Sequence, residues 1–117
     1  VHLDPAIRSA WSGVRIKVTN RKTGASTTYD VPLGSPTKLG SSGLTLTADS
    51  FVPDFVMGAD GITSRSPNPK NTAAHVVISE KGKPDFKGWL FGTMPDIHPF
   101  PHDLYEVTLD SGIPAKK

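Results

Sequence analysis

Hydrophobic and polar residues alternate with a period of two along most of this chain, which is the pattern of strands with one buried and one wet face. The segment 14–19 is the clearest case, because Val14, Ile16 and Val18 share one face and polar residues occupy the other. The segment 27–33 resumes the alternation after a turn at 20–24, so the two predict a hairpin. Pro32 has no amide hydrogen to donate, which predicts an edge strand or a strand end there.

The middle of the chain predicts further short strands. Residues 38–39 form a possible edge segment, 44–48 and 74–79 alternate again, and 62–64 is a short strand. Beyond Asp49 the phase is lost through residues 51–57, which predicts a bulge or bend that lets the strand cross between sheets. Residues 73–92 predict a second hairpin, and residues 104–109 the last strand. Residues 111–117 are expected to be a frayed tail.

The aromatic segment 86–91 is expected to be the centre of the fold. It is too short for an ordinary helix and lies between glycine- and proline-rich breakers. Trp89 and Phe91 would face one side and Phe86 and Leu90 the other. We therefore expect a central strand covered on both faces, with the indole of Trp89 buried between two sheets.

The N-terminal segment 1–12 has a helix start signal, with Asp4 as N-cap and Pro5 at the first helical position. Ile7 and Trp11 would share a face of that helix, and a flexible arm is the alternative. A chain of 117 residues has the length of one domain, here 1–117 with its core at 13–110. The fold class predicted is all-β: a compact antiparallel β-sandwich or partly open β-barrel of about seven short strands.

Composition narrows the possible functions. The formal net charge is +2, but the basic residues are scattered, so no nucleic-acid surface is expected. The absence of cysteine excludes disulfides, thiolate metal sites and cysteine nucleophiles. No run approaches the roughly twenty apolar residues of a membrane-spanning helix. If the protein is exported, its signal has been removed from this sequence.

The loop at residues 94–103 is the first candidate for chemistry. His98 and His102 flank two prolines, with Asp96 and Asp103 nearby, and imidazole with carboxylate suits zinc or copper. The prolines exclude the helix that would place both rings on one face. The alternative is that the histidines cap the loop by bonding backbone carbonyls.

Asp54 and Asp60 form a second candidate, a carboxylate pair for a small hydrolase. Nothing in the sequence makes them converge, so turn-forming or solvated roles explain them as well. Ser64 and Ser66 lack the glycines of a nucleophile elbow. We therefore predict no catalytic residue and no cofactor.

The third candidate is a contact surface for a partner protein, peptide or envelope component. Phe100 and its neighbours in the proline-rich loop, with Phe55 and Met57, would form an exposed apolar patch. The alternative is that these side chains fold inward and fill the core. The binding residues predicted from the sequence are Phe55, Met57, Asp96, His98, Phe100 and His102.

The second half of the chain resembles a family of small exported bacterial proteins known only as a domain of unknown function. The likeness spans roughly residues 13–110, and the segment 88–91, Gly-Trp-Leu-Phe, with its trailing Pro and His loop is its most specific part. The resemblance implies a cleaved signal and a periplasmic address, but no activity. Residues 53–55 and the Asn- and Pro-rich segment that follows also resemble periplasmic parts of ResB-type cytochrome c assembly proteins, which nominates a role in envelope assembly.

Overall fold

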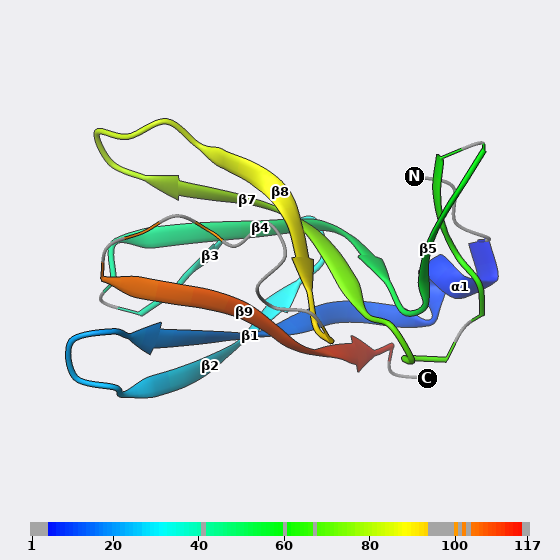
Figure 1. The fold of residues 1–117 in the computed structure, drawn as a ribbon, viewed down its shortest axis with the longest axis horizontal. Coiled ribbons are helices and arrows are strands. Elements are labelled where there is room, and N and C mark those ends of the chain that lie inside the picture. The colour runs from blue at the N-terminus through cyan, green and yellow to red at the C-terminus, as the bar shows by residue number, and fades with distance from the viewer. Residues whose placement is uncertain are drawn as a thin grey trace.

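The computed structural model describes residues 5–40, 42–59, 61–66, 68–93, 100, 102 and 104–115. This part of the chain is all-β apart from one five-residue helix, as predicted (Figure 1). The elements in chain order are α1 (Pro5–Ser9), β1 (Trp11–Asn20), β2 (Ser26–Pro32), β3 (Thr37–Lys38), β4 (Leu44–Val52), β5 (Phe55–Gly58), β6 (Gly61–Ser64), β7 (Ala73–Glu80), β8 (Phe86–Phe91) and β9 (Tyr105–Pro114).

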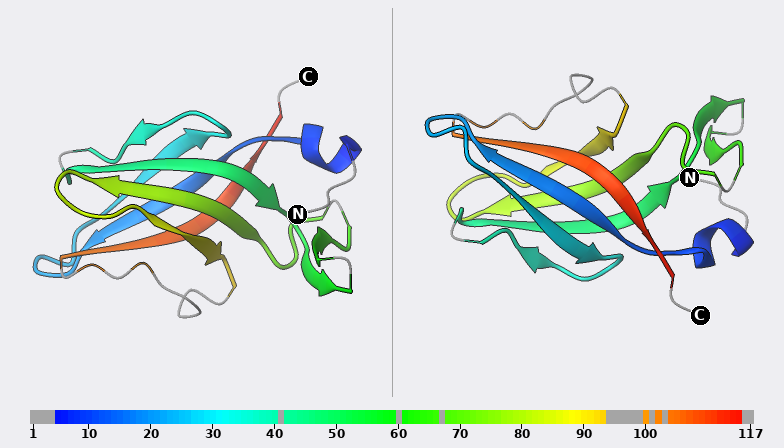
Figure 2. Two further views of the ribbon diagram at one scale, coloured as in Figure 1. Left: turned by 90° about the horizontal axis from the view of Figure 1, so that it is seen from above. Right: turned by 90° about the horizontal axis from the view of Figure 1, so that it is seen from below.

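Two antiparallel sheets lie one above the other. One has the strand order β2-β1-β9 and the other β3-β4-β7-β8, while β5 and β6 form a separate hairpin. Figure 1 shows the two layers, and Figure 2 shows their strands crossing at an angle, as in sandwiches of twisted sheets. The sheet order confirms that β2, with Pro32, and the short β3 are at edges.

A single hydrophobic core fills the space between the layers, because the inward residues of both sheets belong to one cluster. The alternation read from the sequence is confirmed in β1, where Val14, Ile16 and Val18 are buried and Arg15 and Lys17 between them are exposed. The buried cluster comprises Val14, Ile16, Val18, Val31, Leu39, Leu44, Leu46, Ala48, Phe51, Ala74, Val76, Ile78, Leu90, Phe100, Val107 and Leu109.

A β-bulge lies just before the segment 51–57 where an irregularity was predicted, but the expected crossing between sheets was wrong, because β4 stays paired with β7 up to Val52. The pairing of β4 with β7 shifts between Ala48 and Ser50. Leu44, Leu46 and Ala48 point inward before the shift, and Phe51 points inward after it. The extra residue therefore changes which side chains face the core, which is why the phase is lost in the sequence.

Strand β8 is at a sheet edge, so the expectation of a central strand was wrong. Trp89 is partly exposed, and its indole is not buried between the two sheets. The alternation itself was right, because Leu90 points into the core while Trp89 points outward. Strand β9 belongs to the opposite sheet, where it pairs with β1, so it does not extend the sheet beyond β8.

The chain ends differ from the prediction in extent. Helix α1 forms at Pro5, but none of its residues is buried, and Trp11 belongs to β1. Strand β9 continues to Pro114, which pairs with Trp11, so residues 111–114 belong to the sheet and not to a frayed tail. Within the described residues, no helix has the length and apolar character needed to cross a membrane.

Candidate binding site

The β5–β6 hairpin projects from the end of the sandwich where β4 and β8 finish (Figure 1). Its strands pair from Phe55 with Ser64 to Gly58 with Gly61. Gly61 has a φ of 111°, which favours glycine, so the chain can reverse there within very few residues. Strands of four residues bury little surface themselves, and the hairpin needs support from its neighbours.

That support comes from a polar base around Asp54. Its side chain is buried, and its Oδ2 accepts a hydrogen bond from Ser66 Oγ at 2.9 Å. Its backbone N–H donates to Ser64 Oγ at 3.0 Å, and Arg65 N–H donates to its carbonyl at 2.8 Å. Asp54 thus joins both strands of the hairpin to the preceding chain. Asp60 lies outside the described residues, so the predicted carboxylate pair stays a prediction.

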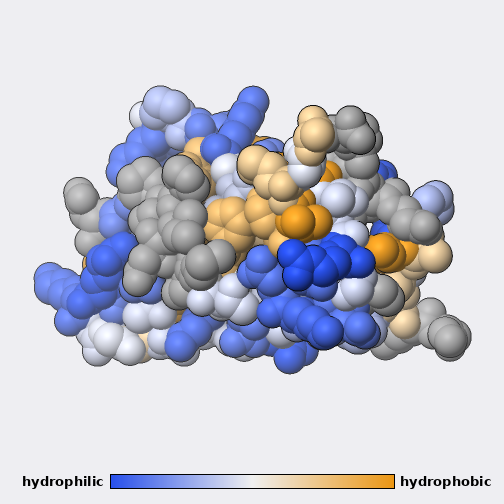
Figure 3. Space-filling model, turned by 45° about the vertical axis from the view of Figure 1, so that its right-hand side comes forward, coloured by the Kyte–Doolittle hydropathy of each residue, from blue (hydrophilic) through white to orange (hydrophobic). Residues whose placement is uncertain are grey.

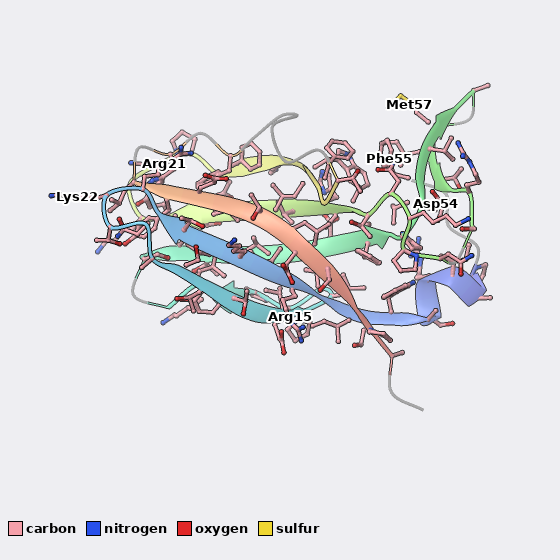
Figure 4. All side chains as sticks on the ribbon, turned by 60° about the horizontal axis from the view of Figure 1, so that its bottom comes forward. Arg15, Arg21, Lys22, Asp54, Phe55 and Met57 are labelled. Atoms are coloured by element: carbon pink, nitrogen blue, oxygen red, sulfur yellow. The ribbon has the colours of Figure 1, made fainter. Side chains whose placement is uncertain are left out.

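Phe55 fastens the hairpin onto the outer face of β8. Its ring lies 5.5 Å from that of Trp89 and 5.0 Å from that of Phe91, both edge-to-face, between ring centroids. Such aromatic pairs contribute about 0.5–1.5 kcal/mol each beyond the area they bury. Figure 4 shows Phe55 pointing from the hairpin toward the sandwich.

A groove remains between the hairpin and β8. It has a volume of about 390 Å³. We call it the aromatic groove, and it is lined by Phe55, Met57, Ile62, Phe86, Lys87, Gly88, Trp89 and Phe91. Figure 3 shows an apolar patch on this side of the molecule with hydrophilic residues below it. A contiguous apolar surface of this kind is a common feature of binding sites.

Met57 is the most exposed part of this groove. Its residue surface is 68% accessible, and it is the one large exposed hydrophobic residue in the described part of the chain. Figure 4 places it beyond Phe55 on the same hairpin. An exposed methionine presents a flexible, polarisable side chain, which adapts to differently shaped apolar partners.

Polar groups border the groove on the outer face of the sheet. His75 stacks edge-to-face on Trp89, with ring centroids 5.2 Å apart, and its Nδ1 lies 2.9 Å from Asp49 Oδ2. Lys87 is exposed on the same face of β8 as Trp89. Within the described residues Lys87 forms no ion pair, whereas Lys83 is held by Glu80 at 3.3 Å.

His102 belongs to a second cleft, of about 320 Å³, near the β7–β8 turn. Its Nδ1 lies 3.1 Å from the backbone N–H groups of both Leu104 and Tyr105, so Nδ1 accepts and carries no proton. Its Nε2 therefore carries the proton and donates to Glu80 Oε1 at 3.2 Å. This hydrogen bond, with help from Lys83, lowers the pKa of Glu80 below its ordinary value.

His102 consequently stabilises the start of β9. The expectation that this histidine bonds backbone carbonyls was wrong, because its ring accepts from two backbone amides and its other nitrogen donates to a carboxylate. Phe100 is 8% exposed and packs on Phe86 at 5.3 Å between ring centroids, so it folds inward, as the alternative interpretation had it. In the described residues no three His, Asp or Glu side chains gather at metal-binding distance. Asp96, His98 and Asp103 lie outside those residues, and the metal site stays a prediction.

Four of the six residues predicted as one binding surface are described, and these four divide between two places. Phe55 and Met57 line the aromatic groove, while Phe100 and His102 line the second cleft. Phe86 lines both the groove and the cleft.

Sequence reasoning missed Trp89 and Lys87 as groove residues. The positions 87, 89 and 91 share one face of the strand, so the pattern contained the signal. The large indole favours burial, but Trp89 is on the outer face of an edge strand and stays partly exposed.

The sequence matches no protein-family model, no curated protein and no solved structure. The resemblance to exported bacterial proteins and the periplasmic address therefore remain predictions, and the functional argument depends on the groove itself.

Proposed function

We propose that this domain is a non-enzymatic binding module that holds an apolar segment of a partner protein in the aromatic groove. The observation that carries the proposal is the exposed Met57 beside a groove of about 390 Å³ walled by aromatic rings. Aromatic residues and methionine are enriched at the centres of protein interfaces, where they supply most of the binding energy.

The composition of the groove favours binding over catalysis. Lys87 is the single ionisable residue among the described residues that line it. A hydrolytic site needs a nucleophile or activated water together with an acid or base within hydrogen-bond reach. An apolar wall with one cation at its border instead suits a partner that is mostly apolar.

The position of the groove favours a protein partner. Its lining extends along the edge strand β8 from Phe86 to Phe91, and the short β5–β6 hairpin supplies the remaining lining residues. A segment of polypeptide fits an elongated surface of this kind better than a compact ligand that requires enclosure. We extend the proposal to a partner in the bacterial envelope, on the resemblance alone.

A displayed library of random peptides tests the proposal. We expect selection on the wild-type domain to enrich apolar peptides that lose binding to Met57→Lys. Ala25→Lys is the matched control, because Ala25 is exposed between β1 and β2. Figure 4 shows Lys22, in the same connection, at the opposite end of the molecule from Met57. Both variants add one charge to an exposed position.

The two indole N–H signals in a nitrogen-15 correlation spectrum provide an internal control. A peptide bound in the groove should shift the signal of Trp89 and leave that of Trp11, which contacts Phe51 in the core, unchanged. Enriched peptides that bind Met57→Lys as well as they bind wild type, or that move only Trp11, would refute the proposal.

A further inference from the structure

We infer that the occupant of the aromatic groove is an extended peptide that pairs antiparallel with β8 and places an acidic side chain opposite Lys87. This inference rests on the proposed function and specifies the class of ligand. It derives from the edge position of β8, the residues that line the groove, and the charge at its border.

Strand β8 has a free pairing edge within the described part of the chain. It is the last strand in the order β3-β4-β7-β8, and its register partners all belong to β7. An edge strand presents N–H and C=O groups that pair readily with another extended segment. Addition of a strand is a recurring mode of peptide recognition, in which the main chain supplies affinity and alternate side chains supply specificity.

The lining of the groove follows this edge. Lys87 and Trp89 point to the outer face of β8, while Phe86 points to the inner face, and all three line the same groove. A groove confined to one face of the sheet would not include residues of both orientations. Gly88 lies between them, and a Cβ there would approach Phe86 Cζ to 2.9 Å. A side chain at this position would therefore displace the ring of Phe86, which lines the groove.

The outer face of β8 determines the order of side chains that a paired strand should have. Phe91, Trp89 and Lys87 are two residues apart on that face. Successive same-face residues of an antiparallel partner would meet them in this order. From its N-terminus, the partner peptide is therefore expected to have the sequence pattern apolar, any residue, apolar, any residue, acidic. Antiparallel addition is favoured because all pairs between β3, β4, β7 and β8 are antiparallel.

The acidic residue follows from the charge of Lys87. This ammonium lies at the border of the apolar wall and has no ion-pair partner in the described residues. An opposite charge directly across a strand pair is stabilising, and a like charge is destabilising. One cation is too few for the polybasic surfaces that nucleic acids or anionic membranes require, so a single carboxylate on the peptide is the fitting partner.

Capped synthetic peptides of identical composition test the inference. The antiparallel peptide is Ser-Thr-Leu-Thr-Val-Thr-Asp-Thr-Ser, and its reversal, Ser-Thr-Asp-Thr-Val-Thr-Leu-Thr-Ser, places the acid at the wrong end. Affinity is measured by calorimetry and by the Trp89 indole signal. We expect the first peptide to bind about fivefold more tightly than its reversal, and Lys87→Glu to remove this preference.

Charge exchange and backbone methylation complete the test. Replacing Asp in the peptide by Lys should weaken binding to wild type and restore binding to Lys87→Glu. Lys81→Glu, the same charge change in the β7–β8 turn, should have no effect.

Backbone methylation tests the pairing itself. One peptide is methylated at the amides of Leu, Val and Asp, and a second at the amides of the Thr residues between them, and the affinities of the two peptides should differ. Only alternate amides face β8, so one pattern should cost about tenfold and the other little.

The possible outcomes distinguish failure of strand pairing from failure of the proposed function. Equal binding of the two peptides, or equal effects of the two methylation patterns, with the Trp89 signal still shifting, would overturn strand pairing and leave the proposed function standing. Failure of every peptide to bind would overturn the inference, and failure of the library selection as well would overturn the proposed function. Self-association of the domain through β8 in place of peptide binding would also overturn the inference.

Discussion

The two faces of the β7–β8 hairpin differ in what covers them. The inner face carries mostly small and aliphatic residues, Ala74, Val76, Ile78 and Leu90, with the single ring of Phe86, and a whole second sheet packs on it. The outer face carries Trp89 and Phe91, and its described cover includes only the short β5–β6 hairpin. The largest ring, the indole of Trp89, is therefore on the face with the smaller cover. Residue size indicates how much surface an element can bury, while the cover determines how much it does bury.

Truncation of the inner face should produce the largest loss of stability. Ile78 is 2% exposed, and Ile78→Ala should lower the free energy of unfolding by about 2–5 kcal/mol, because it removes buried methyl groups and leaves a cavity. Val77→Ala, at the neighbouring outward position, should cost less than about 1.5 kcal/mol. Urea denaturation of both variants measures the difference. Equal losses would mean that the outer face is packed as tightly as the inner one.

Removal of the hairpin's anchor should have an intermediate effect. Phe55→Ala abolishes two edge-to-face ring contacts, with Trp89 and Phe91, and should lower the free energy of unfolding by roughly 1–3 kcal/mol. Trp89 fluorescence should move to longer wavelength, because the indole gains contact with water. Phe55→Leu, which keeps an apolar side chain, should recover part of the stability. A spectrum unchanged in Phe55→Ala would contradict the described contact.

The interaction between Glu80 and His102 should produce a smaller, pH-dependent effect. The hydrogen bond from His102 Nε2 lowers the pKa of Glu80 in the folded protein below its unfolded value of about 4.3. A depressed pKa stabilises the fold above the unfolded pKa, and this stabilisation is lost as pH falls through the folded pKa. Unfolding free energies measured from pH 6 downward should therefore fall less steeply in Glu80→Gln than in wild type. The same change at the exposed Glu106 should leave the wild-type slope, and an unchanged slope in Glu80→Gln would contradict the assignment.

The elements that the sequence predicted correctly are those specified by local pattern. Strand β1 and the two long hairpins follow from alternation and turn residues within a few positions of each other. The bulge in β4 was visible as a loss of phase after Asp49. These features depend on neighbouring residues, so a single sequence is enough to predict them.

The features that escaped prediction depend on pairing between distant segments. Strand β8 is at an edge because β9 pairs with β1 in the other sheet. No local sequence pattern predicts which strand β9 pairs with. The roles of His102 require Glu80, which is 22 residues away. The groove likewise needs the β5–β6 hairpin to fold back onto Trp89. Sequence alone pointed to Phe55 and Met57, but not to the strand that completes their site.

The smallest effect on stability is expected at Met57, where the effect on binding should be large. Its side chain is mostly in water already, so Met57→Ser should leave the free energy of unfolding within about 0.5 kcal/mol of wild type. Peptides that bind in the aromatic groove should nevertheless lose affinity, because serine cannot replace the apolar contact. Paired denaturation and calorimetric titration make the comparison. Substitution of a residue that maintains the fold lowers stability and binding together, whereas substitution of a residue that only contacts a partner lowers binding alone. A substantial loss of stability in Met57→Ser would therefore place this side chain with the inner face of the sandwich and remove the main reason for assigning the groove to a partner.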